Sequence, residues 1–202
     1  DLARSRGLGD VYKRQIDVHS STAAEVFDVS IQDVSQDQRR SAKAINFGLM
    51  YGMSAFGLTR QLNISRAEAQ EYLDTYFARY TGVRDYMNDI KNKAKEDKFV
   101  ETIMGRRLYL NEINAANGLR RQAAERAAIN APLQGSAADI IKKAMLDIDE
   151  LLLKEMSDVK MIMQVHDELV FECPQEIAKL AMEKVKNIME KTVDLKIPLI
   201  AE

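Results

Sequence analysis

The stretch RRSAKAINFGLMYG, residues 39–52, has the most regular pattern in this chain of 202 residues. Large side chains recur in it at every fourth position, and they are Arg39, Lys43, Phe47 and Tyr51. Residues four apart on a helix lie on one side, so these four predict a row of two cations followed by two aromatic rings. Asp37 precedes the stretch as an expected cap, and we expect the helix to cover residues 38–52.

The order of side chains in this row fits a nucleotide lying along the helix. A triphosphate is a dense anion that a forked guanidinium and the point charge of an ammonium would bind, near the first turns where the helix dipole favours anions. Phe47 and Tyr51 offer flat faces for a base or sugar, since stacking on aromatic rings depends little on base identity. Gly48 and Gly52 would leave room for close approach. A helix with a basic first turn and a buried aromatic seam has the same spacing, so this alternative stays open.

The stretch MIMQVHDELVFE, residues 161–172, predicts a second candidate site. Its apolar runs are typical of two short strands, and the polar residues His166, Asp167 and Glu168 would stand at the exposed tip of a hairpin. A carboxylate at such a tip can bind a metal, and magnesium prefers hard oxygen ligands. An acidic turn that only contacts water would have the same pattern.

Three long polar side chains interrupt the alanine-rich stretch AAERAAINAPLQGSAADII, residues 123–141. They are Arg126, Asn130 and Gln134. These side chains could donate hydrogen bonds to the acceptors that every base pair presents in the minor groove. We expect Pro132 to separate two helices by forcing Ala131 out of the helical region. A solvated polar face is the alternative.

The overall charge gives no sign of a nucleic-acid partner, because the formal net charge is -2 and the isoelectric point is near 5.9. A phosphate-binding surface must therefore come from local clusters. Candidates for contacts with backbone phosphates are Arg106, Arg107, Arg120 and Arg121. Exposed arginines also serve solubility alone, so this assignment is a hypothesis.

The remaining sequence predicts an α+β fold that is mostly helical. Ser65 and Glu68 form a capping box, and the Thr81-Gly82 pair should end the helix that they begin. A β-hairpin is predicted around Gly105, and residues 196–202, KIPLIAE, resemble a strand that is cut short. Expected helices cover residues 21–27, 64–80, 83–95, 120–130, 134–155 and 174–191.

The composition excludes several classes of protein. With 46% hydrophobic and 30% charged residues, the chain is neither disordered nor fibrous. One cysteine, Cys173, cannot form an internal disulfide, which fits a reducing cytosol. No apolar run approaches the roughly 18 residues of a membrane helix, so we expect neither a membrane span nor export. Residues 1–15 have no periodicity and predict a loose leader, whose foreign origin stays open.

Taken together, these motifs resemble the A-family DNA polymerases, in particular the bacterial DNA polymerase I type. Residues 39–58, RRSAKAINFGLMYGMSAFGL, resemble motif B of the fingers helix, and residues 161–172 are similar to motif C. Residues 123–141 resemble the palm helices that contact primer-template. The resemblance implies helical fingers at residues 16–97, packed on a partial palm at residues 98–202 with a small antiparallel β-sheet and a motif C hairpin at residues 160–173.

The resemblance also implies roles for single residues. Arg39 and Lys43 would hold the phosphates of the incoming deoxynucleoside triphosphate, and Lys43 would protonate the pyrophosphate that leaves. Phe47 would lie against the sugar. Tyr51 would pack beside the nascent base pair.

For the hairpin, the resemblance implies that Asp167 ligates one of two Mg²⁺ ions, that His166 lies near the primer end and that Glu168 has a supporting role. The DNA contacts would come from Arg126, Asn130 and Gln134, with Arg106 and Arg107 adding positive charge. The implied partners are primer-template DNA and deoxynucleoside triphosphates, and we expect a monomer in the bacterial cytoplasm.

Motif A, a DxSQIELR-like strand with the second catalytic aspartate, does not occur in residues 1–15. We expect it upstream of residue 1. The chain alone should therefore have little or no polymerase activity, whereas the intact protein should be active. A non-catalytic nucleic-acid-binding module, a relative of the single-subunit RNA polymerases and a helical interaction protein remain the alternatives.

Overall fold

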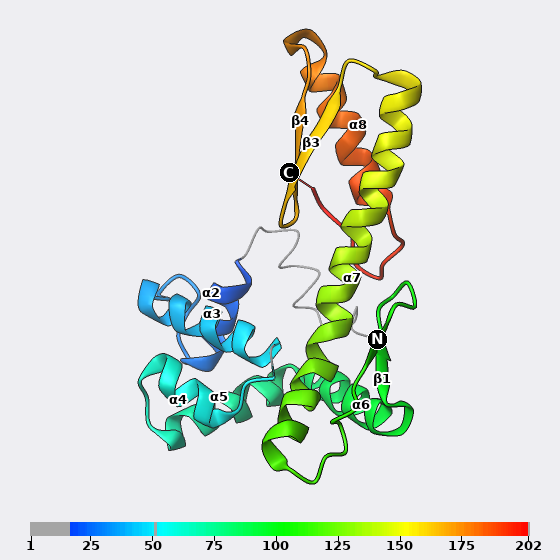
Figure 1. Cartoon of the computed structure of the whole chain (residues 1–202). Coiled ribbons are helices and arrows are strands. Elements are labelled where there is room, and N and C mark those ends of the chain that lie inside the picture. The colour runs from blue at the N-terminus through cyan, green and yellow to red at the C-terminus, as the bar shows by residue number, and fades with distance from the viewer. Residues whose placement is uncertain (1–16, 51, 202) are drawn as a thin grey trace. The chain divides into compact units, whose positions relative to one another are not determined.

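The computed structural model describes residues 17–50 and 52–201 (Figure 1). The leader expected at residues 1–15 and Tyr51 lie outside this range. The elements of the described residues are, in order, α2 (Val18–Val26), α3 (Gln36–Met50), α4 (Ala55–Leu62), α5 (Arg66–Arg79), α6 (Thr81–Asp97), β1 (Phe99–Glu101), β2 (Arg107–Tyr109), α7 (Gly118–Glu155), β3 (Lys160–Val165), β4 (Glu168–Glu172), a 3-10 turn (Gln175–Ile177) and α8 (Ala178–Lys191). Helices predominate beside two small antiparallel sheets, which confirms the expected fold class.

The described residues divide into two compact units. The first runs up to Glu101 and includes Arg107–Pro132, and the second comprises Thr102–Arg106 and the residues from Leu133 onward. The division of the chain into fingers at residues 16–97 and palm at residues 98–202 stays a prediction.

One of two core clusters in the described part of the first unit forms where α3 packs with its neighbours α2 and α4. Ala42, Ile45 and Leu49, three or four residues apart, are buried on one side of α3. Ile45 and Leu49 share a cluster with Leu58 of α4 and Leu73 of α5. Because these apolar residues fix one side of α3, the row of larger side chains is left on another.

Capping side chains explain where α3 and α5 begin. The hydroxyl of Ser65 accepts from the Glu68 amide, and the Glu68 carboxylate accepts from the Ser65 amide, so the predicted capping box is confirmed. An equivalent pair precedes α3. The Ser35 hydroxyl accepts from the backbone N–H of Gln38 at 3.2 Å, and the side-chain oxygen of Gln38 accepts from the backbone N–H of Ser35 at 2.9 Å. The expectation that Asp37 caps this helix is wrong, because Asp37 already lies in the first turn.

Two expected helix boundaries are also wrong. The helix that Ser65 begins ends as expected, because α5 stops at Arg79 and its C-cap Tyr80 directly precedes Thr81-Gly82. The expected start of the next helix at Val83 is wrong, since Thr81 already opens α6. Pro132 does not end a helix, and α7 continues through it from Gly118 to Glu155.

A tyrosine contacts the turn of α7 that precedes Pro132. Proline has no amide hydrogen, so the carbonyl four residues earlier loses its usual donor. The hydroxyl of Tyr86 on α6 donates to the next carbonyl, that of Ile129, at 3.1 Å. Half-burial raises the pKa of Tyr86, which keeps this hydroxyl protonated. A donor from α6 thus supports the turn of α7 that the proline weakens.

Both predicted hairpins are confirmed. Strands β1 and β2 pair in antiparallel register, with Val100 opposite Leu108. In the second unit, β3 and β4 pair with Val165 opposite Glu168 and with an irregularity between Met161 and Met163. This second hairpin lies beside α8 and the later turns of α7 (Figure 1).

A separate core holds the second unit together. It contains Ile148 and Leu152 of α7, Ala181 and Val185 of α8, and Leu169 of β4. The expected strand at the end of the chain is wrong, because residues 196–201 form neither helix nor strand. Pro198 has no amide hydrogen to give to a neighbouring strand.

In the part of the chain that the structure describes, no helix combines the length and the apolar character needed to cross a membrane.

Candidate functional site

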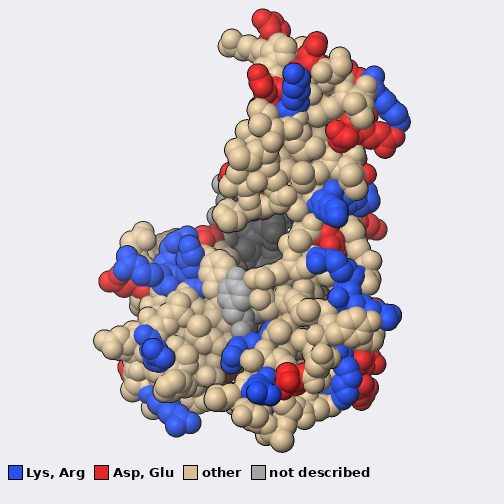
Figure 2. Space-filling view, viewed as in Figure 1, with Lys and Arg blue, Asp and Glu red and all other residues tan. Residues whose placement is uncertain are grey.

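The first three members of the row on α3 belong to the first unit. Arg39 is partly exposed, while Lys43 and Phe47 are exposed, and the Phe47 ring keeps 39% of its accessible surface. Lys and Arg side chains gather over α2 and α3 (Figure 2). The row therefore does not form the buried aromatic seam that its spacing also permitted. Tyr51, its expected fourth member, lies outside the described residues.

Arg39 has a forked ion pair with Asp17, the N-cap of α2. Its Nε lies 2.8 Å from Oδ2 and its second nitrogen 3.2 Å from Oδ1. Burial raises the pKa of Asp17, but hydrogen bonds from Arg39 and Ser20 outweigh this and lower the pKa to about 2. The carboxylate is thus ionised at neutral pH and fixes the direction of the guanidinium.

Lys43 and Phe47 form the exposed centre of the row. The ammonium nitrogen of Lys43 lies 5.8 Å from the centre of the Phe47 ring, within the range of a cation–π contact. Because Lys43 has no ion pair with another described residue, its ammonium charge is available to an anion.

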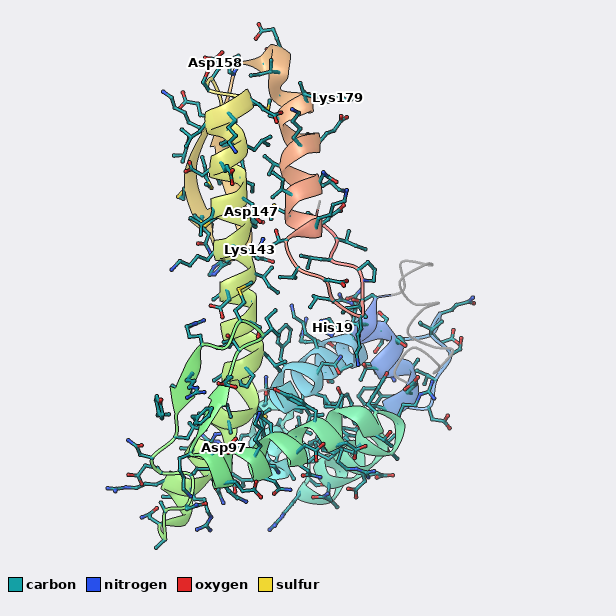
Figure 3. The ribbon with its side chains drawn as sticks, turned by 90° about the vertical axis from the view of Figure 1, so that its right-hand side faces the viewer. His19, Asp97, Lys143, Asp147, Asp158 and Lys179 are labelled. Atoms are coloured by element: carbon teal, nitrogen blue, oxygen red, sulfur yellow. The ribbon has the colours of Figure 1, made fainter. Side chains whose placement is uncertain are left out.

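His19 joins this row from α2, although no pattern in the sequence indicated it. Its ring centre lies 5.8 Å from that of Phe47, at an interplanar angle of 41°. Figure 3 marks His19 on α2, the helix that packs on α3. Burial lowers the pKa of His19, as do the charges of Arg39 and Lys43, whereas the charge of Asp17 raises it. A single histidine carries no spacing pattern, so only the packing of two helices could show this neighbour.

Protein atoms fill the spaces beside both glycines of the row. A Cβ on Gly48 would lie 3.0 Å from the sulfur of Met53. Gly52 has a φ of +67°, and a Cβ there would lie 2.9 Å from Arg126 Cγ and 3.3 Å from a methyl carbon of Ile129. The expectation that these glycines leave room for a ligand is therefore wrong, since Gly52 instead lets the turn after α3 approach α7.

This approach brings Arg126, a predicted DNA contact, beside the end of α3. The Arg126 side chain is exposed, and Asn130 is partly exposed one turn further along α7. Gln134 is exposed but belongs to the second unit. Since α7 continues through Pro132, these three residues follow each other at a spacing of four along one helix.

Arg106 and Arg107 have protein partners. Arg106 donates to the Asp139 carboxylate and to the Gly135 carbonyl, both at 2.9 Å. Hydrogen bonds from Thr102 and Arg106 lower the pKa of Asp139 against the opposing effect of burial. These contacts attach the β1–β2 turn to α7 within the second unit. They give Arg106 a structural role beside its predicted contact with DNA.

Arg107, in the first unit, contacts its own hairpin. It donates to Glu101 at 2.7 Å and lies 4.3 Å from the centre of the Phe99 ring. Of the other basic candidates, Arg121 donates to the Ala115 carbonyl at 2.9 Å, and Arg120 lies 3.9 Å from Glu112. Such contacts stabilise the local structure, so a phosphate would have to compete with them.

The tip of the β3–β4 hairpin presents the second candidate site. His166 and Asp167 form a two-residue turn, and His166 has a φ of +55°. The sequence predicted that Glu168 also belongs to the turn. In the structure it is instead the first residue of β4, opposite Val165. The Gln164 side chain donates to the His166 carbonyl at 2.8 Å. All three predicted site residues are exposed.

These residues do not complete a metal site by themselves. Among residues 17–50 and 52–201, no group of three or more histidine, cysteine or carboxylate side chains could hold a metal ion. The described residues therefore supply Asp167 as one hard oxygen ligand, but no group of three ligands that would complete a site.

A cavity of about 1000 Å³ lies beside the hairpin in the second unit. Asp167 and Glu168 contribute to its rim, and its walls are mostly apolar side chains of α7, β4, α8 and the C-terminal segment. Lys186 adds a cation to the lining. The catalytic candidates thus border an apolar hollow, which nothing in their sequence predicted.

Comparison with known proteins gives matches over the whole chain. The sequence profile described as DNA polymerase family A matches residues 1–202. DNA polymerase I of Pseudomonas aeruginosa is 54% identical over 201 residues, which is 100% of this chain and 22% of that protein. DNA polymerase I of Geobacillus stearothermophilus is 44% identical over 98% of this chain and 23% of its own length.

A solved structure agrees with these matches. The POL domain of Pol1 from M. smegmatis, in a complex with DNA primer-template and dNTP, superimposes with a TM-score of 0.90 at 42% identity. The match covers 98% of this chain and 35% of that one. The chain thus spans between a fifth and a quarter of the length of these two polymerases and about a third of the solved domain. By its sequence and its fold, the chain belongs to DNA polymerase family A.

Proposed function

We propose that this chain is the nucleotide-binding part and one section of the catalytic part of a template-directed DNA polymerase, which extends the 3′ end of a primer in the whole protein. The observation that carries the proposal is the row on α3. There a fixed guanidinium, an ammonium that has no ion pair among the described residues, and an exposed ring follow each other. This order corresponds to the phosphates and then the sugar of a nucleotide.

The cations of the row would bind the triphosphate. Arg39 is already oriented by Asp17, so little side-chain entropy is lost when a phosphate replaces or shares that partner. Lys43 would neutralise charge as the pyrophosphate leaves and would supply it with a proton. His19 adds a ring beside the same row. Phe47 would lie against the sugar, and Tyr51 would pack beside the new base pair.

Asp167 would bind Mg²⁺ together with carboxylates from outside the described residues. Two Mg²⁺ ions, when bound, neutralise charge on the attacking and the leaving oxygen of a phosphoryl transfer. His166 would lie near the primer end, and Glu168 would have a supporting role. Because Asp167 is exposed at a turn, ligands from another segment can reach it.

Primer-template DNA would be bound by α7 and its surroundings. Arg126, Asn130 and Gln134 would donate to acceptors in the minor groove, which are similar for every correct base pair. Arg106 and Arg107 would add positive charge near backbone phosphates. We propose that the whole protein is monomeric, acts in the bacterial cytoplasm and contains fingers at residues 16–97 and a palm from residue 98.

The test is a primer-extension assay with the whole protein that contains this chain. One deoxynucleoside triphosphate at a time is offered, and the first template base is changed in turn. The proposal predicts that only the complementary nucleotide is added and that the preference follows the template. Binding of DNA without addition would instead indicate a non-catalytic module. A preference for ribonucleotides would indicate an RNA polymerase. The absence of binding would indicate a helical interaction protein.

A further inference from the structure

Asn46 has no part in the proposed function, although it directly precedes Phe47. Its side chain is turned toward α2 and contacts two residues there. The amide nitrogen Nδ2 lies 3.0 Å from the hydroxyl of Thr22 and 3.1 Å from Nδ1 of His19. Thr22 is almost completely buried, so these contacts belong to the packed interface of two helices.

The position of each hydrogen follows from the three bonds of Thr22. A hydroxyl has one hydrogen to donate. Thr22 Oγ1 lies 2.9 Å from the Val18 carbonyl and 3.3 Å from Asn46 Oδ1, so the hydrogen goes to Val18. Oγ1 accepts one hydrogen of the Asn46 amide at 3.0 Å, and the second amide hydrogen is then directed to His19 Nδ1 at 3.1 Å. If the amide were rotated by 180°, its oxygen would lie 3.0 Å from Thr22 Oγ1, whose hydrogen already goes to Val18, so two oxygens would meet without a hydrogen between them.

His19 Nδ1 is therefore an acceptor, and the single hydrogen of the neutral ring is on Nε2. We propose that Asn46 is a positioning residue: it holds His19 in this tautomer, so that the ring presents an Nε2–H donor to the nucleotide phosphates that bind Arg39 and Lys43. This inference rests on the proposed function, because it assigns Asn46 to the same site.

The charges around His19 agree with a neutral ring. In the described residues, the charged groups facing it are Asp17 at the start of α2, and Arg39 and Lys43 on α3. Burial lowers the pKa of His19, the two cations lower it further, and Asp17 acts in the opposite direction. The imidazolium of His19 therefore loses one proton at a lower pH than an ordinary histidine. In the neutral ring that remains, the tautomer decides which nitrogen can donate a hydrogen bond.

The decisive variant is Asn46→Asp in the whole protein. A carboxylate can only accept, so it would take a hydrogen from Nδ1, leave Nε2 without one and raise the pKa of His19. Above that pKa, we expect the KM for the complementary nucleotide to rise about tenfold, with a smaller change in kcat. As the pH falls through the raised pKa, the ring gains its second hydrogen, Nε2 donates again and the KM defect disappears.

Two controls distinguish this effect from damage to the fold. In a His19→Ala background, Asn46→Asp should cause no pH-dependent change in KM, because the proposed effect acts through the ring. Asn92→Asp places the same charge on an exposed position of α6 and should leave KM and its pH profile unchanged.

The tautomer itself can be measured without any polymerase activity. Nitrogen-15 NMR of the imidazole rings, with the His19 signals assigned by their loss in His19→Ala, should show Nε2 protonated in the wild type and Nδ1 protonated in Asn46→Asp. A wild-type ring protonated on Nδ1, or a KM defect of Asn46→Asp that is independent of pH, would overturn the inference. A wild-type protein that has the predicted tautomer but adds no nucleotide would overturn the proposed function instead.

Discussion

The α3 row and the tip of the β3–β4 hairpin present their candidate residues in opposite ways. Side chains hold the row in place: Asp17 orients Arg39, and Asn46 contacts His19. The tip depends on strand pairing and one bond from Gln164 to a backbone carbonyl. Asp167 and Glu168 have no hydrogen bond or ion pair to another described side chain. The first region is therefore preorganised for a ligand, whereas the second presents a carboxylate that other groups must complete.

This difference predicts how each region responds to substitution. Substitution of one residue in the row should lower activity only in part, because several side chains are proposed to bind the phosphates together. A change of Asp167 should be severe, because it is the carboxylate proposed to bind the catalytic metal. The following predictions test this contrast in the whole protein.

Asp167→Asn should have the largest effect. Loss of a metal-binding carboxylate removes several kcal/mol of transition-state stabilisation, so single-turnover primer extension should slow by roughly 10³-fold. Affinity for primer-template should change little, since Asp167 is proposed as a catalytic ligand. The matched control is Glu172→Gln at the far end of β4, where the side chain is also exposed and extension should stay normal. Extension by Asp167→Asn at the wild-type rate would remove Asp167 from the mechanism.

Lys43→Ala should have the second-largest effect. A charged hydrogen bond contributes about 1.5–3 kcal/mol, so kcat/KM for the nucleotide should fall by roughly 10- to 100-fold, with both binding and turnover affected. The control Arg40→Ala removes a cation from the same helix and should leave kcat/KM unchanged, because the Arg40 side chain is 82% exposed and its ion pair among the described residues is with Asp37 at 3.6 Å. Steady-state kinetics should separate the two variants, and equal kinetics for Lys43→Ala and wild type would contradict the proposed role.

Asp17→Asn should lower the free energy of unfolding by about 1 kcal/mol at pH 7. The effect is this small because 37% of the Asp17 side chain is exposed and water screens its ion pair. The folded pKa of about 2 is below the reference value of 3.8, so the ionised form stabilises the fold above pH 4. This contribution is lost as the pH falls from about 4 toward 2. The midpoint of thermal unfolding should therefore be lower for Asp17→Asn than for the wild type at pH 7, and the difference between the two midpoints should become smaller in acid. A difference that becomes larger in acid would contradict the ion pair.

Tyr86→Phe should have the smallest effect. It removes one neutral hydrogen bond, to the carbonyl of Ile129, and should cost about 1 kcal/mol in the free energy of unfolding. Urea unfolding measures this loss. Tyr109→Phe is the control, because the Tyr109 side chain is 63% exposed on β2. If both variants lose the same amount, Tyr86 gives no special support to α7 at Pro132.

The sequence predicted elements whose signals are local. The capping box of Ser65 and Glu68 depends on a spacing of three residues, and the β3–β4 hairpin depends on two apolar runs around a short polar segment. The row from Arg39 to Phe47 follows from helical spacing alone. These features need no knowledge of distant contacts, so they could be predicted.

Features that depend on distant residues could not be predicted in this way. Pro132 was expected to end a helix, but α7 continues through it, and the Tyr86 hydroxyl that contacts this turn lies 43 positions before its partner Ile129. Gly52 was expected to leave room for a ligand, but side-chain atoms of α7 lie beside it. His19 approaches Phe47 only because α2 packs on α3. In each case, tertiary packing decided between outcomes that a local pattern leaves open.

The most direct test of the central claim compares the purified 202-residue chain with the whole protein on one primer-template with Mg²⁺ and the complementary nucleotide. We predict that the whole protein extends the primer and that the 202-residue chain, freed of host polymerase, does not, because its described residues hold no complete metal site. Extension by the 202-residue chain, or none by the whole protein, would contradict the claim that this chain contributes one incomplete part of a polymerase active site.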